Sequence, residues 1–151
     1  MEVVSRLNGL LTNAEVLEVL QEKRAAQEAS AAKEQLVRSK VEREELQSRD
    51  FVELAAIDHV EGTRKNSTTK EVVKFTKEME RLCQMPAVQG GLGSVKLTEA
   101  EMMQLCNSMP TTEIELLLLL TDGHVRCTEM QVESIVACVC KCFNITPDDE
   151  E

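Results

Sequence analysis

The sequence contains no tryptophan and no tyrosine, and only three of its 151 residues are phenylalanine. A core of stacked aromatic rings is therefore excluded, and the core has to be built from Leu, Val, Met, Ala and Cys. Proline and glycine are also scarce, with three and six residues, so few positions interrupt a helix. Strong helix formers are abundant, whereas β-branched residues are scattered rather than clustered. These absences predict an all-α protein of one domain, or of one domain with an extension.

Long apolar runs are absent as well. No stretch of about twenty apolar residues occurs, so we expect no transmembrane helix. The N-terminus, MEVVSRLNGLL, has no basic region followed by a long apolar segment, so we expect no signal peptide. An intracellular protein follows from both expectations, and its six cysteines are then expected to be reduced thiols.

Positive charge is nearly missing from the last third of the chain. The formal net charge is −10, and residues 97–151 carry two basic and eleven acidic side chains. Nucleic-acid phosphates would be repelled by such a segment, so autonomous nucleic-acid binding is not expected there. Basic residues concentrate at 64–81, and we interpret this concentration as a solvated helix face.

The pattern Ser/Thr-x-x-Glu/Gln marks helix starts, because the hydroxyl accepts from one unpaired backbone N–H and the acid or amide reaches back to another. Six such pairs occur: Thr12–Glu15, Ser39–Glu42, Thr68–Glu71, Thr98–Glu101, Thr112–Glu115 and Thr128–Gln131. Five of them head an apolar periodic run and predict a helix start. Ser39–Glu42 heads no such run, so we interpret it as accidental.

The first helix is predicted to begin near Asn13. Residues 21–50 hold no proline or glycine, much Ala, Glu, Lys and Arg, and few large apolar side chains. High helix propensity with little to bury predicts either a long exposed helix or a charged, partly ordered insertion. A second apolar segment, residues 51–60, is expected to end at Gly62.

A further helix is predicted over residues 69–84, where apolar side chains recur at spacings of three and four. The stretch AVQGGLGSVK after it predicts a flexible loop. Three shorter helices follow within residues 98–143, and none is long enough to be stable alone in water. We therefore expect these helices to pack on one another and on 69–84 as a small bundle.

Helical periodicity also predicts which side chains face the core of this bundle. The expected inward-facing residues after Thr98 are Met102, Leu105, Cys106 and Met109, and those of the last helix are Met130, Ile135, Val139 and Cys142. The leucine run 116–120 is expected to be buried on nearly every side.

Few residues in the sequence suggest a metal-binding or catalytic site. Cys138, Cys140 and Cys142 suggest a zinc site, but closed zinc sites usually pair ligands as Cys-x2-4-Cys with a second pair elsewhere, so we expect these thiols to pack as small apolar groups. His59 and His124 have no partner arrangement typical of a nucleophile and its base. We therefore expect no catalytic residue, no metal site and no cofactor.

An apolar stripe near the N-terminus is expected to be buried against another surface. Its residues are Leu10, Leu11, Val16, Leu17, Val19 and Leu20. The stripe either folds back onto the bundle or binds a partner as a helix in a groove, and the pattern alone leaves both open.

Three segments together resemble a known family. They are LLTNAEVLEVLQE (10–22), EVVKFTKEMERL (71–82) and LTEAEMMQLCNSMPTTEIELLLLLTDGHVRCTEMQVESIVACV (97–139). They resemble the ninth-subunit family of RNA polymerase III, also known as the calcitonin gene-related peptide receptor component. This family is related to the fourth subunit of RNA polymerase II and to the corresponding subunit of the archaeal polymerase. The opening MEVV before LTNAEVLEVL favours the polymerase III member.

The resemblance implies a bundle like the helicase-and-RNase-D C-terminal domain and a non-catalytic role. Members form a heterodimeric stalk with a β-barrel-containing subunit on a nuclear polymerase core, and the stalk supports initiation. Initiation factors stay open as further partners; neither a membrane nor sequence-specific nucleic-acid binding is expected. The implied partner-binding residues are Val3, Val4, Leu10, Leu11, Val16, Val19 and Leu20.

The expected organisation is a partner-binding arm at 1–22, a charged helical or partly disordered insertion at 23–50, a helical bundle at 51–143 and an acidic tail at 144–151. Two alternative functions stay open. One is a stalk subunit of RNA polymerase II, and the other is a free-standing helical nucleic-acid-binding or adaptor module.

Overall fold

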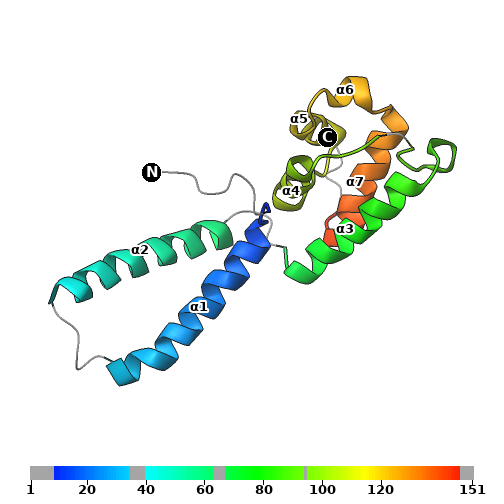
Figure 1. Cartoon of the computed structure of the whole chain (residues 1–151). Coiled ribbons are helices and arrows are strands. Elements are labelled where there is room, and N and C mark those ends of the chain that lie inside the picture. The colour runs from blue at the N-terminus through cyan, green and yellow to red at the C-terminus, as the bar shows by residue number, and fades with distance from the viewer. Residues whose placement is uncertain (1–8, 35–39, 63–66, 94, 147–151) are drawn as a thin grey trace. The chain divides into compact units, whose positions relative to one another are not determined.

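The computed structural model describes residues 9–34, 40–62, 67–93 and 95–146 (Figure 1). Within these ranges the chain forms seven α-helices and one short 3-10 helix, and it forms no strand. The predicted all-α class is therefore confirmed. The helices fall into two compact units: one is Asn13–Asn66, and the other is Ser67–Glu151 together with Met1–Thr12.

The first unit is a helical hairpin of α1 (Asn13–Glu34) and α2 (Lys40–Gly62) (Figure 1). The two helices run antiparallel. Lys23 Nζ lies 2.5 Å from Glu53 Oε1, and Gln21 Nε2 donates to Glu61 Oε1 over 3.0 Å. The described parts of 23–50 are thus helical.

The domain boundaries in the structure differ from those expected from the sequence. α2 runs without interruption from Lys40 to Gly62, so residues 51–62 group with α1 and not with the bundle. The physical reason is that no proline or glycine separates the charged stretch from the apolar one, and helix propagation costs little once it has started. The start of α2 directly follows Ser39, which lies outside the described residues.

The second unit is a bundle. Its elements are α3 (Thr69–Gln84), the 3-10 helix η1 (Ala87–Gln89), α4 (Glu99–Ser108), α5 (Glu113–Leu119), α6 (Gly123–Arg126) and α7 (Glu129–Phe143). The capping boxes at Thr68, Thr98 and Thr128 are confirmed, each with both reciprocal bonds. At the start of α5 only one of the two reciprocal bonds of a capping box forms. Thr112 accepts from the Glu115 N–H, whereas the Glu115 carboxylate accepts from the Thr111 N–H.

The core of the bundle lies between α3 and α7, which pack antiparallel (Figure 1). The rings of Phe75 on α3 and Phe143 on α7 have centroids 5.3 Å apart. Around them the predicted inward-facing residues Leu105, Ile135 and Val139 are fully buried. Two of the three aromatic side chains in the whole sequence are therefore used in one contact between two helices.

Two burial expectations are wrong. Leu118, in the middle of the leucine run, is 81% exposed, because α5 lies at the surface and only Leu116 within it and Leu120 directly after it are buried in the core. Met130 is 62% exposed. It precedes Ile135 by five residues, which is about 140° around a helix, so the two side chains cannot share one face.

The glycine-rich loop after α3 is packed, although a flexible loop was expected. Leu92 is fully buried, and its N–H donates to the Leu82 carbonyl over 2.9 Å. The Leu92 carbonyl accepts from Gln131 Nε2 on α7 over 2.9 Å. Gly91 permits this return, because a Cβ at that position would lie 2.2 Å from the Met85 carbonyl oxygen. No helix in the described part of the chain is long and apolar enough to cross a membrane.

Candidate partner-binding surface

The seven predicted partner-binding residues divide between the described and undescribed parts of the chain. Val3 and Val4 lie outside the described residues. Leu10 and Leu11 are exposed and precede α1. Val16 and Leu20 are half-buried and share one face of α1, since they are four residues apart. Val19 lies off that face and is 56% exposed. Leu10, Leu11 and Val19 are therefore accessible on this chain.

Three exposed apolar side chains on α2 were missed by sequence reasoning. Phe51, Val52 and Leu54 are all exposed, although the sequence assigned residues 51–60 to the bundle. A signal for them did exist. Apolar side chains at 51–60 occupy both sides of a helix, and a hairpin with a single partner helix buries only one side.

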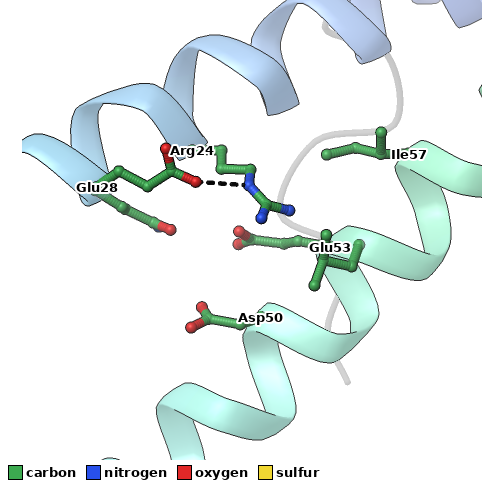
Figure 2. A pocket seen from close by; sticks show the side chains of 7 residues that line it. Arg24, Glu28, Asp50, Glu53 and Ile57 are labelled. Carbon is green, nitrogen blue, oxygen red and sulfur yellow. Dashed lines mark hydrogen bonds and ion pairs between the residues drawn. The ribbon is translucent and has the colours of Figure 1, made fainter. Parts of the chain in front are cut away.

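A cavity of about 220 Å³ opens between α1 and α2 (Figure 2). Its lining residues are Arg24, Gln27 and Glu28 from α1 and Asp50, Glu53, Leu54 and Ile57 from α2. Ion pairs satisfy charges around it. Arg24 Nε donates to Glu28 Oε1 over 2.9 Å, and Glu53 accepts from Lys23. The cavity therefore offers neither an uncompensated charge at Arg24 or Glu53 nor a nucleophile.

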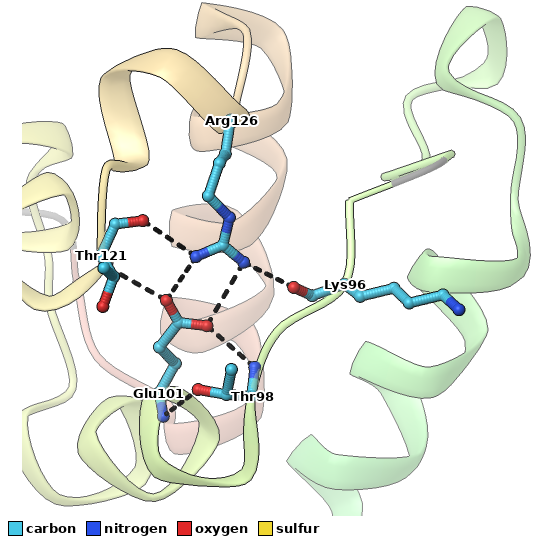
Figure 3. Close-up of polar contacts among 5 residues, drawn as sticks. All are labelled: Lys96, Thr98, Glu101, Thr121 and Arg126. Atoms are coloured by element: carbon cyan, nitrogen blue, oxygen red, sulfur yellow. Dashed lines mark hydrogen bonds and ion pairs between the residues drawn. The ribbon is translucent and has the colours of Figure 1, made fainter.

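Among the described residues of the bundle, the most buried acidic side chain is that of Glu101 on α4, which is shown in Figure 3. Its Oε2 accepts from the Thr98 N–H over 2.8 Å, and its Oε1 accepts from the Thr121 N–H over 3.0 Å. Arg126 Nη1 donates to Oε1 over 2.6 Å. The guanidinium also donates to the carbonyl oxygens of Lys96 and Thr121. The Glu101–Arg126 pair thus links three parts of the bundle: the segment before α4, the turn between α5 and α6, and α6 itself.

The Glu101–Arg126 ion pair stabilises the fold and is not suited to acid–base catalysis. A general acid or base needs a pKa near the working pH. Burial would raise the pKa of Glu101, but the hydrogen bonds from Arg126, Thr98 and Thr121 outweigh burial and lower the pKa to about 2. The carboxylate stays ionised at neutral pH and acts as an anchor.

We expect Glu101 to make the bundle acid-sensitive. Because its pKa falls from 4.5 in the unfolded chain to about 2 in the folded one, its contribution is fully present above pH 4.5 and is lost as the pH falls toward 2. The lost free energy of unfolding is at most about 3 kcal/mol, from 1.36 kcal/mol per pKa unit. Urea titrations between pH 6 and pH 2, on wild type and Glu101→Gln, measure it. Parallel pH profiles of the two proteins would contradict the assignment.

The sequence was compared with models of known protein families. A family model described as RNA polymerase Rpb4 matches residues 10–143. The match begins at an exposed leucine before α1, runs through the hairpin and the bundle, and ends at the last residue of α7.

The chain belongs to the RNA polymerase Rpb4 family.

Rpb4-family proteins are non-catalytic stalk subunits of RNA polymerase, so the functional site of this chain is a surface for other subunits. The bounds of the match enclose residues 23–50, where the sequence alone suggested an insertion. The observed geometry fits a binding subunit, because apolar side chains before and on the helices are exposed, and every buried side-chain polar atom in the described part of the chain has a hydrogen-bond partner.

Four of the six cysteines of this Rpb4-family chain are buried, and Cys83 and Cys127 are half-buried. Cys138, Cys140 and Cys142 on α7 are all buried. Burial, together with the neighbouring Cys142, raises the pKa of the Cys138 thiol to about 12, so it stays protonated at neutral pH. Among the described residues, no group of three or more His, Cys, Asp or Glu side chains is placed to hold a metal ion. His59 and His124 are both exposed.

Proposed function

We propose that this chain is the stalk subunit of DNA-directed RNA polymerase III. It forms a heterodimer with a β-barrel-containing partner subunit and supports transcription initiation in the nucleus. The observation that carries the proposal is the family match over residues 10–143, because it includes the N-terminal apolar segment as well as the bundle. The opening MEVV before LTNAEVLEVL favours polymerase III over polymerase II.

The partner surface in this proposal consists of apolar side chains before and within α1. They are Val3, Val4, Leu10, Leu11, Val16, Val19 and Leu20. The exposure of Leu10, Leu11 and Val19 supports this partner surface. A partner that removes these apolar side chains from water lowers the free energy of the complex.

The membership of the chain is tested by purifying it with a tag from native nuclear extract and identifying the proteins that co-purify by mass spectrometry. Recovery of a β-barrel stalk subunit with the large subunits of polymerase III is the expected result. Large subunits of polymerase II instead would move the chain to that enzyme. Recovery of no polymerase subunit from an extract with intact polymerase would contradict the stalk function and leave an adaptor module.

The Val19→Asp substitution is expected to lower recovery of the partner subunit about tenfold or more, because it places a charge in an apolar contact. The free energy of unfolding should change by less than about 0.5 kcal/mol, since the side chain is exposed. Val73→Asp on α3 is the matched control, because Val73 is also exposed but lies in the bundle. Equal recovery with both variants would remove Val19 from the interface.

A further inference from the structure

The two units of the chain differ in how much apolar surface they bury. In the α1–α2 hairpin the structure describes the side chains of residues 13–28 and 47–62, and among these only Ala14 is buried. The bundle contains buried apolar side chains from α3, α4, α5 and α7, and Phe75 and Leu116 are completely covered. Apolar burial is the main favourable contribution to folding, so the described part of the hairpin gains much less from it than the bundle does.

The space between α1 and α2 is not closed by apolar side chains. A cavity of about 220 Å³ lies there, and four of its seven lining residues are charged: Arg24, Glu28, Asp50 and Glu53 (Figure 2). Charged groups are costly to remove from water, so the space between the helices stays hydrated. A helix pair that holds water in this way lacks the close packing of a protein interior.

Polar contacts join the two helices instead. Lys23 Nζ lies 2.5 Å from Glu53 Oε1, and Gln21 Nε2 donates to Glu61 Oε1 over 3.0 Å. The Glu53 side chain is 15% exposed, whereas that of Lys23 is 47% exposed. Arg49, one turn earlier on α2, has its Nε 3.7 Å from the same Glu53 oxygen. A single carboxylate therefore holds a cation from each helix of the hairpin.

The ion pair between the helices is sensitive to salt. Dissolved ions screen charges that water can reach, and the Debye length falls from about 10 Å at 0.1 M to about 3 Å at 1 M. The central contact of the bundle, between Phe75 and Phe143, contains no charge that salt could screen. A rise in ionic strength therefore weakens the hairpin and leaves the central contact of the bundle intact.

Separation of α1 and α2 also has a consequence for the helices themselves. Most helical stability in proteins comes from tertiary packing, so a helix that loses its neighbour is only partly formed in water. The backbone N–H groups of an open hairpin then exchange with solvent much faster than those of a packed helix. Opening is therefore visible in hydrogen exchange.

We infer that the α1–α2 hairpin opens and closes while the bundle stays folded, and that the Lys23–Glu53 ion pair holds it closed. Low ionic strength favours the closed hairpin, and high ionic strength favours the open one. The inference is independent of the proposed function, because it rests only on contacts within this chain.

Hydrogen exchange of the full chain, followed by mass spectrometry at neutral pH, tests the inference. In about 20 mM sodium chloride, hairpin peptides should exchange about a hundredfold faster than peptides from α3 and α7, because local opening costs less free energy than global unfolding. In about 500 mM sodium chloride, the exchange of the hairpin should become about threefold faster, and that of α3 and α7 should stay the same.

Substitutions test the ion pair. Glu53→Gln removes the charge that joins the helices and should make hairpin exchange in low salt about threefold faster. Glu28→Gln is the matched control, because Glu28 pairs with Arg24 within α1, and it should leave the exchange nearly unchanged. The double variant Lys23→Gln with Glu53→Gln should exchange no faster than Glu53→Gln alone, because both break the same pair.

Each part of the inference has its own contrary result. Equal protection of the hairpin, α3 and α7 would overturn it entirely, because the chain would then open as one cooperative unit. A hairpin that opens separately but shows no response to salt would overturn the role of the ion pair. Equal effects of Glu53→Gln and Glu28→Gln would overturn that role as well.

Discussion

Replacing Phe75 with alanine is expected to lower the free energy of unfolding of the bundle by about 4 kcal/mol. Phe75 is completely buried, and its ring contacts Phe143 across the packed helices α3 and α7. The substitution removes the largest apolar side chain of α3 from the core and leaves a cavity where the two helices meet. Urea denaturation followed by circular dichroism at neutral pH measures the loss.

The chain provides its own control for this result. Phe51→Ala removes the same atoms from a position that is 73% exposed, so the free energy of unfolding should change by less than about 0.5 kcal/mol. A loss at position 51 as large as the loss at position 75 would show that Phe51 is part of the chain's own core.

The Glu101→Gln variant is expected to lose about 3 kcal/mol of stability at neutral pH. An amide keeps the shape of the carboxylate but can accept through only one oxygen. It therefore fails to satisfy the Thr98 N–H, the Thr121 N–H and the Arg126 guanidinium together, and it leaves a partly buried cation without its counter-charge. The midpoint of urea denaturation should fall with little change in slope.

Glu78→Gln is the control for Glu101, because it also removes an arginine-bound carboxylate. Glu78 Oε1 accepts from Arg81 Nη2 over 2.7 Å on the surface of α3, where water screens the ion pair, so the loss of stability should be much smaller than for Glu101. Similar losses for the two variants would mean that burial does not strengthen the Glu101–Arg126 pair.

Helix starts could be predicted from the sequence because their signals are local. Thr68, Thr98 and Thr128 each bond to a residue three positions later, so the whole capping box lies within four residues of sequence. The same locality explains the success with the inward-facing residues of α4. Their burial follows from the period of one helix against one core.

Features that depend on distant residues could not be predicted. Glu101 is recognisable as a capping residue, but its bond to Arg126 spans 25 positions of sequence and depends on how α4 and α6 approach each other. Leu92 was assigned to a flexible loop because glycines surround it. Its backbone carbonyl accepts a hydrogen bond from Gln131, which is 39 positions away.

The candidate site was only partly accessible to sequence reasoning. Resemblance pointed to the apolar residues before and within α1, whereas Phe51 was assigned to the bundle. The error came from treating the change in composition near residue 50 as a domain boundary. A helix continues through such a change when no residue there disfavours helical dihedral angles, and α2 does so.

The packing of α3 on α7 also determines when this protein is able to fold during its synthesis. Phe143 follows Phe75 by about 70 residues, so the closure of a long loop has to precede the central contact of the bundle. A ribosome releases α3 first, and its apolar face then has no partner until α7 has emerged. Throughout that interval the nascent chain exposes the apolar side chains of Val72, Phe75 and Met79, and exposed apolar surface of this kind is prone to aggregate.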